Sequence, residues 1–196
     1  MSDERRVSAK IAHDFTRRAF LAAGLSQKDA RTIADNLILA ELRGISSHGM
    51  TRLIYYLKKL EDGGFNAAPN LQVVSERLGT FVVDADRAPG AVAGTFAMQK
   101  CIAKAKQTGI CMGSVRNSNH FGIAAFYALM ALEHDMIGMA FCNTVANMNV
   151  YGGIDKVSGS NPICAAIPAD NAAPFVYDGA TSAVAQGKVV VARKEG

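Results

Sequence analysis

Two polar segments of this 196-residue chain carry the residue types that acid/base chemistry requires. The first contains Ser47, His48 and Arg52. An α-helix beginning near Ser47 places His48 and Arg52 four residues apart, on one face. An imidazole that titrates near neutrality, beside a guanidinium that grips a carboxylate through two bonds, suits proton transfer on an anion. The alternative is that Ser47 caps the helix while His48 and Arg52 are solvated.

The second segment, residues 117–122, joins a predicted strand to a predicted helix and contains His120. Ligands of α/β proteins bind at such strand ends, so His120 is a candidate acid or base. Alternatively, the Asn and Ser residues form a turn and His120 satisfies a backbone carbonyl. A third polar stretch, residues 152–162, is a loop of small residues that can wrap a phosphate or carboxylate, which is a weak signal.

Several common cofactor motifs are absent from the sequence. No G-x-G-x-x-G follows a predicted strand, and neither G-x-x-x-x-G-K-[ST] nor H-E-x-x-H occurs, which argues against a Rossmann dinucleotide site, a P-loop and a zincin site. The four histidines lack metal-ligand spacing with nearby carboxylates. We therefore expect no metal site unless His48 and His120 meet in space.

Composition and charge limit the class of protein further. A hydrophobic content of 49% with 19% charged residues is typical of a globular chain that folds without staples. The net charge of +4, with no run of five like charges, disfavours nucleic acid and leaves a small anion as ligand. The four cysteines form no C-x-x-C pair and are expected to be reduced, buried thiols of a cytoplasmic protein.

Nothing in the sequence indicates a membrane protein. Residues 1–6 are charged, and no apolar signal-peptide core follows them. The uncharged stretch 136–154 contains three asparagines and several glycines, so it is too polar to span a bilayer. We expect it to form a buried strand that runs into a loop.

Hydrophobic periodicity predicts the elements that must position the polar segments. The first third is helical, with one apolar stripe at Val7, Ile11, Phe15 and Ala19, a second at Ala30, Ile33, Ala34, Leu37 and Ile38, and a third at Met50, Leu53, Leu57 and Leu60. Gly24 ends the first helix and Ser26 caps the second. Two short strands around Val73 and Val82 meet at a turn near Gly79.

The rest of the chain alternates between helices and strands. We expect helices over residues 89–109 and 123–132, strands over 110–115 and 136–142, buried strands over 162–168 and 175–177, and a helix or strand over 181–193. The fold class is therefore α/β, with an N-terminal helical region followed by a mixed-sheet region.

Four short motifs, in this order, resemble those of the malate/L-lactate dehydrogenase family, which includes ureidoglycolate dehydrogenases and piperideine-2-carboxylate reductases. The matching stretches are LRGISSHG at 42–49, NHFG at 119–122, GSNPI at 159–163 and DGATS at 178–182, followed by GK at 187–188. Four ordered motifs spread over nearly the whole chain are far more specific than any one of them. The resemblance implies a non-Rossmann nicotinamide-binding fold and hydride exchange with a small 2-oxo or 2-hydroxy acid.

The resemblance also implies roles for individual residues. His120 is expected to be the general acid/base for the substrate's C2 oxygen, with Ser47 and His48 as a relay or orienting pair. Arg52, Ser160 and Lys188 are expected on the substrate side, with Arg52 clamping the carboxylate. The expected cofactor contacts are Phe121, Gly122, Thr144, Asp178, Gly179 and Ala180.

Further expectations follow from the family. The cofactor is NAD or NADP, the assembly is a homodimer, and residues 1–68 form the helical domain while 69–196 form the cofactor and substrate domain. Lys188 stands where the piperideine-2-carboxylate reductases carry an aspartate, which favours a hydroxy acid over an imine. Family members are considerably longer than this chain, so we expect the second domain to be incomplete at its C-terminal end. The alternative function is a non-catalytic remnant that binds an anion or a partner chain.

Overall fold

The computed structural model describes residues 6–182, which divide into two compact units. The first unit contains the residues up to Ala97 together with Met112–Gly122. The second contains Met98–Cys111 and the residues from Ile123 onward. Helix α4 (Gly90–Thr108) contributes its N-terminal part to the first unit and its C-terminal part to the second.

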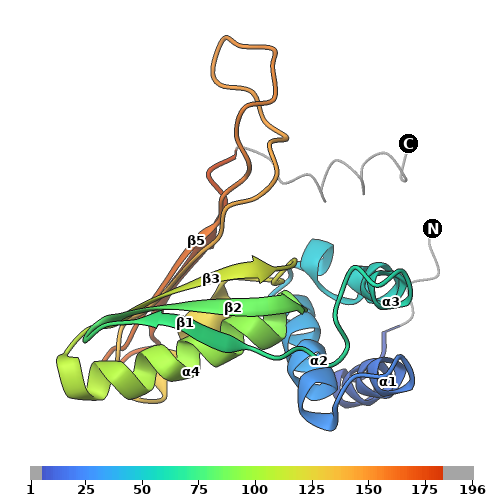
Figure 1. The fold of residues 1–196 in the computed structure, drawn as a ribbon, viewed down its shortest axis with the longest axis horizontal. Helices are drawn as coiled ribbons and strands as arrows, with labels where there is room; N and C mark the ends of the chain where they lie inside the picture. Colours follow the sequence, from blue (N-terminus) through green and yellow to red (C-terminus); the bar gives the residue numbers. More distant parts are fainter. Residues whose placement is uncertain (1–5, 183–196) are drawn as a thin grey trace. The chain divides into compact units, whose positions relative to one another are not determined.

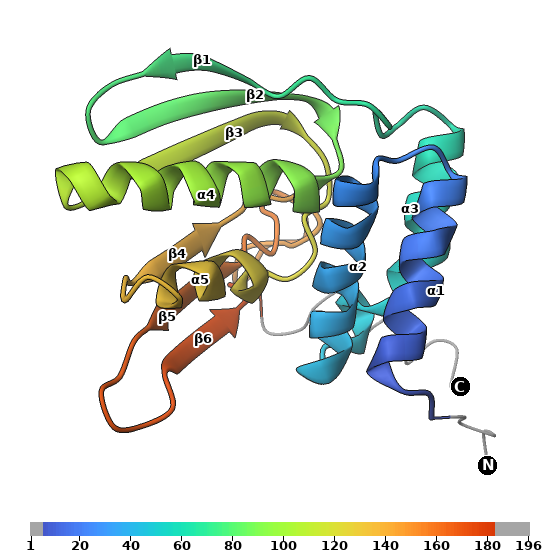
Figure 2. The same cartoon turned by 90° about the horizontal axis from the view of Figure 1, so that it is seen from below.

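Three helices of the first unit lie side by side (Figure 2): α1 (Ala9–Ala22), α2 (Gln27–Leu42) and α3 (Leu53–Glu61). The break between α1 and α2 is formed as the sequence predicts. Gly24 has a φ of 93°, and the Ser26 Oγ accepts a hydrogen bond from the Asp29 backbone N–H at 3.1 Å. The left-handed glycine ends one helix and the serine caps the next.

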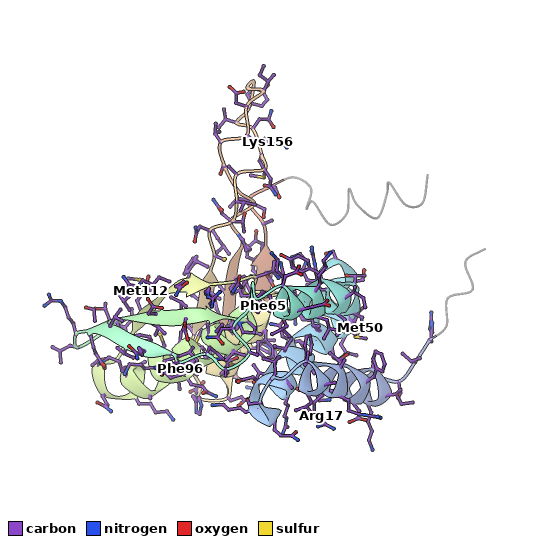
Figure 3. All side chains as sticks on the ribbon, turned by 45° about the vertical axis from the view of Figure 1, so that its right-hand side comes forward. Arg17, Met50, Phe65, Phe96, Met112 and Lys156 are labelled. Carbon is purple, nitrogen blue, oxygen red and sulfur yellow. The ribbon has the colours of Figure 1, made fainter. Side chains whose placement is uncertain are left out.

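The core of the first unit forms around the buried stripe of α2. Ile33 and Leu37 are fully buried against Phe20 from α1 and Tyr56 from α3, with Phe65 closing the cluster. Figure 3 shows the labelled Phe65 and Met50 side chains among those of this unit. The predicted stripe of α2 and the leucines of α3 are thus confirmed as core residues.

The predicted apolar stripe of α1 has a different outcome. Val7, Ile11 and Phe15 are 66%, 64% and 60% exposed, whereas the helix buries Thr16 and Phe20. Thr16 can be buried because its hydroxyl donates to the Ala12 carbonyl oxygen at 2.7 Å. Within residues 6–182 no element covers the exposed stripe, so periodicity located the helix but not its buried face.

The predicted helix start near Ser47 is wrong. Residues Ser46–His48 and Met50–Arg52 form two 3₁₀ turns, η1 and η2, and α3 begins only at Leu53. Gly49 lies between the turns with φ −93° and ψ −137°, which is not a helical conformation. His48 and Arg52 therefore do not share one α-helical face.

The first unit also contains a mixed three-stranded sheet in the order β1-β2-β3 (Figure 1). Strands β1 (Gln72–Glu76) and β2 (Thr80–Ala88) are antiparallel, as predicted, and β2 pairs in parallel with β3 (Met112–Ser118). Strand β3 extends past the predicted end at residue 115. Arg116 and Asn117 stay in the strand because both donate to the Asp84 carboxylate on β2, each at 3.0 Å.

The second unit packs α5 (Ala125–Leu132) on an antiparallel sheet in the order β4-β5-β6. The strands are β4 (Gly138–Phe141), β5 (Ile163–Ile167) and β6 (Phe175–Gly179). The sequence predicts buried strands, but in the structure alternate residues of these strands are exposed. Helix α5 contacts the sheet, and nothing within residues 6–182 buries the side chains on the other face. Residues 142–162 extend away from β4 and β5 as an elongated loop (Figure 1), with Lys156 partway along it (Figure 3).

The α/β fold class is confirmed, with helices first and sheets after them. The four cysteines are free thiols, but only Cys164 is fully buried; the other three are half-buried, which corrects the prediction. Among residues 6–182, no helix is long and apolar enough to cross a membrane. The predicted element over 181–193 lies almost entirely outside the described residues.

Candidate active site

A carboxylate on α2 holds the segment that carries Ser47 and His48. Glu41 Oε1 accepts a hydrogen bond from the Met50 backbone N–H at 2.7 Å. A β-carbon at position 49 would overlap the Glu41 side chain as it lies in this contact, so glycine permits the close approach. The two 3₁₀ turns are thereby fixed to the surface of α2.

His48 and His120 come together, although 72 positions separate them in the sequence. Their rings stack with centroids 5.5 Å apart and planes inclined by 25°. Each Nδ1 faces a hydroxyl group: Ser47 Oγ lies 2.9 Å from that of His48, and the Tyr56 hydroxyl lies 2.6 Å from that of His120. Ser47 thus does not cap the first 3₁₀ turn, and His120 Nδ1 lies against a phenol hydroxyl rather than a backbone carbonyl.

The meeting of the two histidines reopens the possibility of a metal site. Within residues 6–182, however, no group of three or more His, Cys, Asp or Glu side chains gathers around a common point. The Nδ1 atoms of His48 and His120 are instead hydrogen-bonded to the hydroxyls of Ser47 and Tyr56.

Tyr56 is the residue of this site that the sequence analysis missed. It belongs to α3, is 3% exposed and packs against Phe20 and Phe65. Burial raises the pKa of its phenol above the ordinary value, which keeps the hydroxyl protonated at neutral pH. The available signal was a tyrosine one helical turn after Arg52, inside an otherwise aliphatic stripe.

Both imidazoles are neutral at physiological pH. Burial lowers the pKa of His48 to about 4, with a further contribution from the Arg52 charge. Burial also lowers the pKa of His120 to about 3, with His48 and Arg52 adding to the effect. The positive charge of this cluster therefore resides on Arg52.

Arg52 is held in place but keeps its charge unpaired. Its Nε donates to the Ser47 carbonyl oxygen at 2.8 Å. Among residues 6–182, no acidic side chain forms an ion pair with it. A half-buried guanidinium beside two neutral imidazoles is suited to a carboxylate ligand.

The segment that carries His120 is fixed from several directions. Asn119 donates through Nδ2 to the carbonyl oxygens of Gly64, Arg87 and Ala88, at 3.3, 2.9 and 3.2 Å. The Gly122 backbone N–H points to His120 Nδ1 at 3.3 Å. Phe121 and Gly122, expected at the cofactor, thus form the turn directly after the imidazole.

The remaining predicted site residues lie in the second unit. The Thr144 and Ser160 hydroxyls are 3.4 Å apart, and Asn161 Oδ1 accepts from the Thr144 backbone N–H at 2.9 Å. These contacts bring the two ends of the elongated loop together. The predicted site residues thus form two groups, one in each unit.

Asp178, Gly179 and Ala180 lie at the end of β6 and directly after it. Asp178 Oδ2 accepts a hydrogen bond from the Ala125 backbone N–H at the start of α5, at 2.8 Å, so this carboxylate already has a structural contact. Ala180 is exposed. Lys188 lies outside the described residues.

The α/β fold of the chain is shared with dehydrogenases of known structure. A sequence profile of the malate/L-lactate dehydrogenase family matches residues 7–196. The chain belongs to this family, which confirms the resemblance of the four motifs.

Individual relatives agree with this assignment. Malate dehydrogenase of Pyrococcus abyssi is 43% identical over 191 residues, which are 97% of this chain and 52% of that protein. L-sulfolactate dehydrogenase of Methanocaldococcus jannaschii is 39% identical over 172 residues, or 88% of this chain and 50% of that protein. The solved structure of malate dehydrogenase from Pyrococcus horikoshii superposes with a TM-score of 0.93 at 40% identity, covering 96% of this chain and 54% of that one. The chain thus spans about half the length of these relatives.

Proposed function

We propose that the chain is the part of an oxidoreductase that binds a small 2-oxo or 2-hydroxy acid and transfers a proton to or from its C2 oxygen. The observation that carries this proposal is the stacked pair of neutral imidazoles beside a guanidinium that has no acidic partner among residues 6–182. Hydride exchange at C2 requires a proton donor or acceptor and a cation that orients the carboxylate. His120 and Arg52 have these chemical properties.

In this proposal Arg52 binds the substrate carboxylate with the Nη atoms that have no acidic partner among residues 6–182. The bound negative charge offsets the effect of Arg52 on His120, so the pKa of the imidazole rises when the substrate binds. His120 Nδ1 is occupied by Tyr56 and Gly122, which leaves Nε2 for the substrate oxygen. In the reductive direction, the doubly protonated ring donates its Nδ1–H to the Tyr56 hydroxyl oxygen and gives its Nε2 proton to the substrate oxygen, which returns the ring to its neutral form.

A nicotinamide cofactor, NAD or NADP, supplies or accepts the hydride when it is bound. The residues expected to hold it suit its chemistry: the Thr144 and Ser160 hydroxyls can donate and accept, and a carboxylate such as Asp178 can accept from ribose hydroxyls. Gly122 is also proposed to contact the cofactor, through its backbone. These roles, with those of Ser47, His48, Phe121, Gly179, Ala180 and Lys188, are part of the proposal.

We further propose a cytoplasmic homodimer. The free thiols support a reducing compartment. The exposed stripe of Val7, Ile11 and Phe15 supports a second subunit, because apolar surface of this kind is usually covered in an assembly.

The decisive experiment is turnover of a panel of 2-oxo acids with NADH or NADPH, for the wild-type chain and for His120→Ala. Loss of a general acid/base costs about a hundredfold to ten-thousandfold in rate. Near-normal turnover in His120→Ala would remove this residue from the mechanism. A wild-type chain that neither turns over nor changes reduced-nicotinamide fluorescence would instead support the non-catalytic alternative.

A further inference from the structure

A single peptide group connects a buried asparagine of α2 to the His120 ring. Asn36 Nδ2 donates to the Phe121 carbonyl oxygen at 3.2 Å, and Asn36 is 1% exposed. The N–H of the same peptide group, which belongs to Gly122, donates to His120 Nδ1 at 3.3 Å. The Phe121–Gly122 peptide is therefore held at both its oxygen and its nitrogen.

The contact also explains why position 122 is a glycine. Gly122 has a φ of 76°, and Asn36 Oδ1 occupies the place where a β-carbon at position 122 would stand. Within residues 6–182, this Oδ1 has no hydrogen-bond partner. A buried amide with an unpaired oxygen is unfavourable compared with an apolar side chain of similar size, so stability alone does not account for Asn36.

The two partners of His120 Nδ1, the Tyr56 hydroxyl and the Gly122 N–H, differ in which ring tautomer they allow. The Tyr56 hydroxyl can donate or accept a hydrogen bond, so it tolerates a proton on either ring nitrogen. A backbone N–H can only donate. The Gly122 N–H therefore requires Nδ1 to be an acceptor, which places the proton of the neutral ring on Nε2.

We propose that Asn36 is a positioning residue that selects the Nε2–H tautomer of His120 by fixing the orientation of the Phe121–Gly122 peptide. Its importance for catalysis rests on the proposed function, whereas the tautomer itself does not. Without the Asn36 amide, the Phe121–Gly122 peptide can rotate, and Nδ1 of His120 can then carry the proton. The Tyr56 hydroxyl oxygen would accept the hydrogen bond from this Nδ1–H group. The Nε2–H group would no longer be reliably present for a ligand.

Nitrogen-15 NMR of the histidine rings in the 196-residue chain tests the proposal directly. Asn36→Leu keeps a similar volume and Asn36→Ala leaves a smaller side chain, and neither can donate to the Phe121 oxygen. We expect the wild type to be almost entirely Nε2–H at His120. In both variants, the ratio of Nε2–H to Nδ1–H should fall at least tenfold.

Tyr56→Phe is the matched control, because it removes the other partner of Nδ1 and leaves the Gly122 N–H in place. It should keep the Nε2–H tautomer. An Nδ1–H ring in the wild type, unchanged His120 signals in both folded Asn36 variants, or loss of the tautomer in Tyr56→Phe would each overturn the proposal. Unfolding of both Asn36 variants would assign Asn36 to the core and overturn it as well.

The NMR result does not depend on turnover. A chain that is inactive but shows the expected tautomer change would refute the proposed function and retain the role of Asn36. An active chain whose Asn36 variants keep both the His120 tautomer and the turnover would refute the role of Asn36 and retain the proposed function.

Discussion

Lowering the pH from 7 to 5 should destabilise the folded chain through its two neutral histidines. An unfolded histidine has a pKa of about 6.5. In the folded chain, burial and the Arg52 charge hold the pKa of His48 at about 4 and that of His120 at about 3. As the pH falls through 6.5, the unfolded state takes up protons that the folded state does not, so the stability falls with the pH.

The size of the effect follows from these pKa values. Between pH 7 and pH 5, each ring contributes a loss of about 2 kcal/mol in the free energy of unfolding. Stability falls most steeply between the pKa of the unfolded histidine and the pKa of the folded one, and the fall levels off below about pH 3 to 4. Carboxylates with lowered pKa values, such as Asp84, titrate below the range from pH 7 to pH 5.

Urea-induced unfolding at pH 7 and pH 5, followed by circular dichroism, measures this loss. The difference between the two pH values should shrink by about 2 kcal/mol in His120→Gln and by a similar amount in His48→Gln. His134→Gln is the matched control, because it replaces an exposed ring of the second unit. Site variants that keep the same pH difference as this control would show that the two buried rings do not cause the loss of stability.

Three further substitutions test individual contacts. Tyr56→Phe keeps the aromatic packing but removes the hydroxyl at His120 Nδ1; we expect about a tenfold fall in turnover and a change of about 1 kcal/mol in stability, from steady-state kinetics and urea unfolding. Arg52→Lys keeps the charge but loses the planar two-point grip, so the KM for a 2-oxo acid should rise about tenfold; a wild-type chain that binds the acid and its uncharged amide equally well would contradict this. Gly49→Ala forces the Glu41 side chain away from Met50 and should lower the free energy of unfolding by about 1 to 3 kcal/mol in urea titrations, whereas wild-type stability would show that Glu41 moves freely.

Periodicity and local signals predicted the helices and most strands. Ser26 and Gly24 are local markers whose effect depends only on neighbouring residues, so the α1–α2 break was predictable. The stripe of α2 was also predictable because it is buried against nearby helices. The stripe of α1 was not, since periodicity shows that a helix has an apolar face but not what covers it.

The site geometry could not be predicted from spacing alone. The 3₁₀ turns at residues 46–52 depend on a tertiary contact, the bond between Glu41 and the Met50 N–H, which no local pattern reports. The same is true of Tyr56, whose hydroxyl meets a ring 64 positions away. The sequence motifs named His48, Arg52 and His120, which all lie in the first unit, but they did not reveal the hydroxyl and peptide groups that contact the two imidazoles.

The hydrogen bond from Arg52 Nε to the Ser47 carbonyl has a thermodynamic consequence for ligand binding. A free arginine side chain loses up to about 2 kcal/mol of rotamer entropy when it is immobilised. In this chain part of that freedom is already lost on folding, so an anion meets a guanidinium whose plane is set in advance. In the proposed site, Arg52 would therefore bind the substrate carboxylate with a smaller loss of conformational entropy than a lysine at the same position.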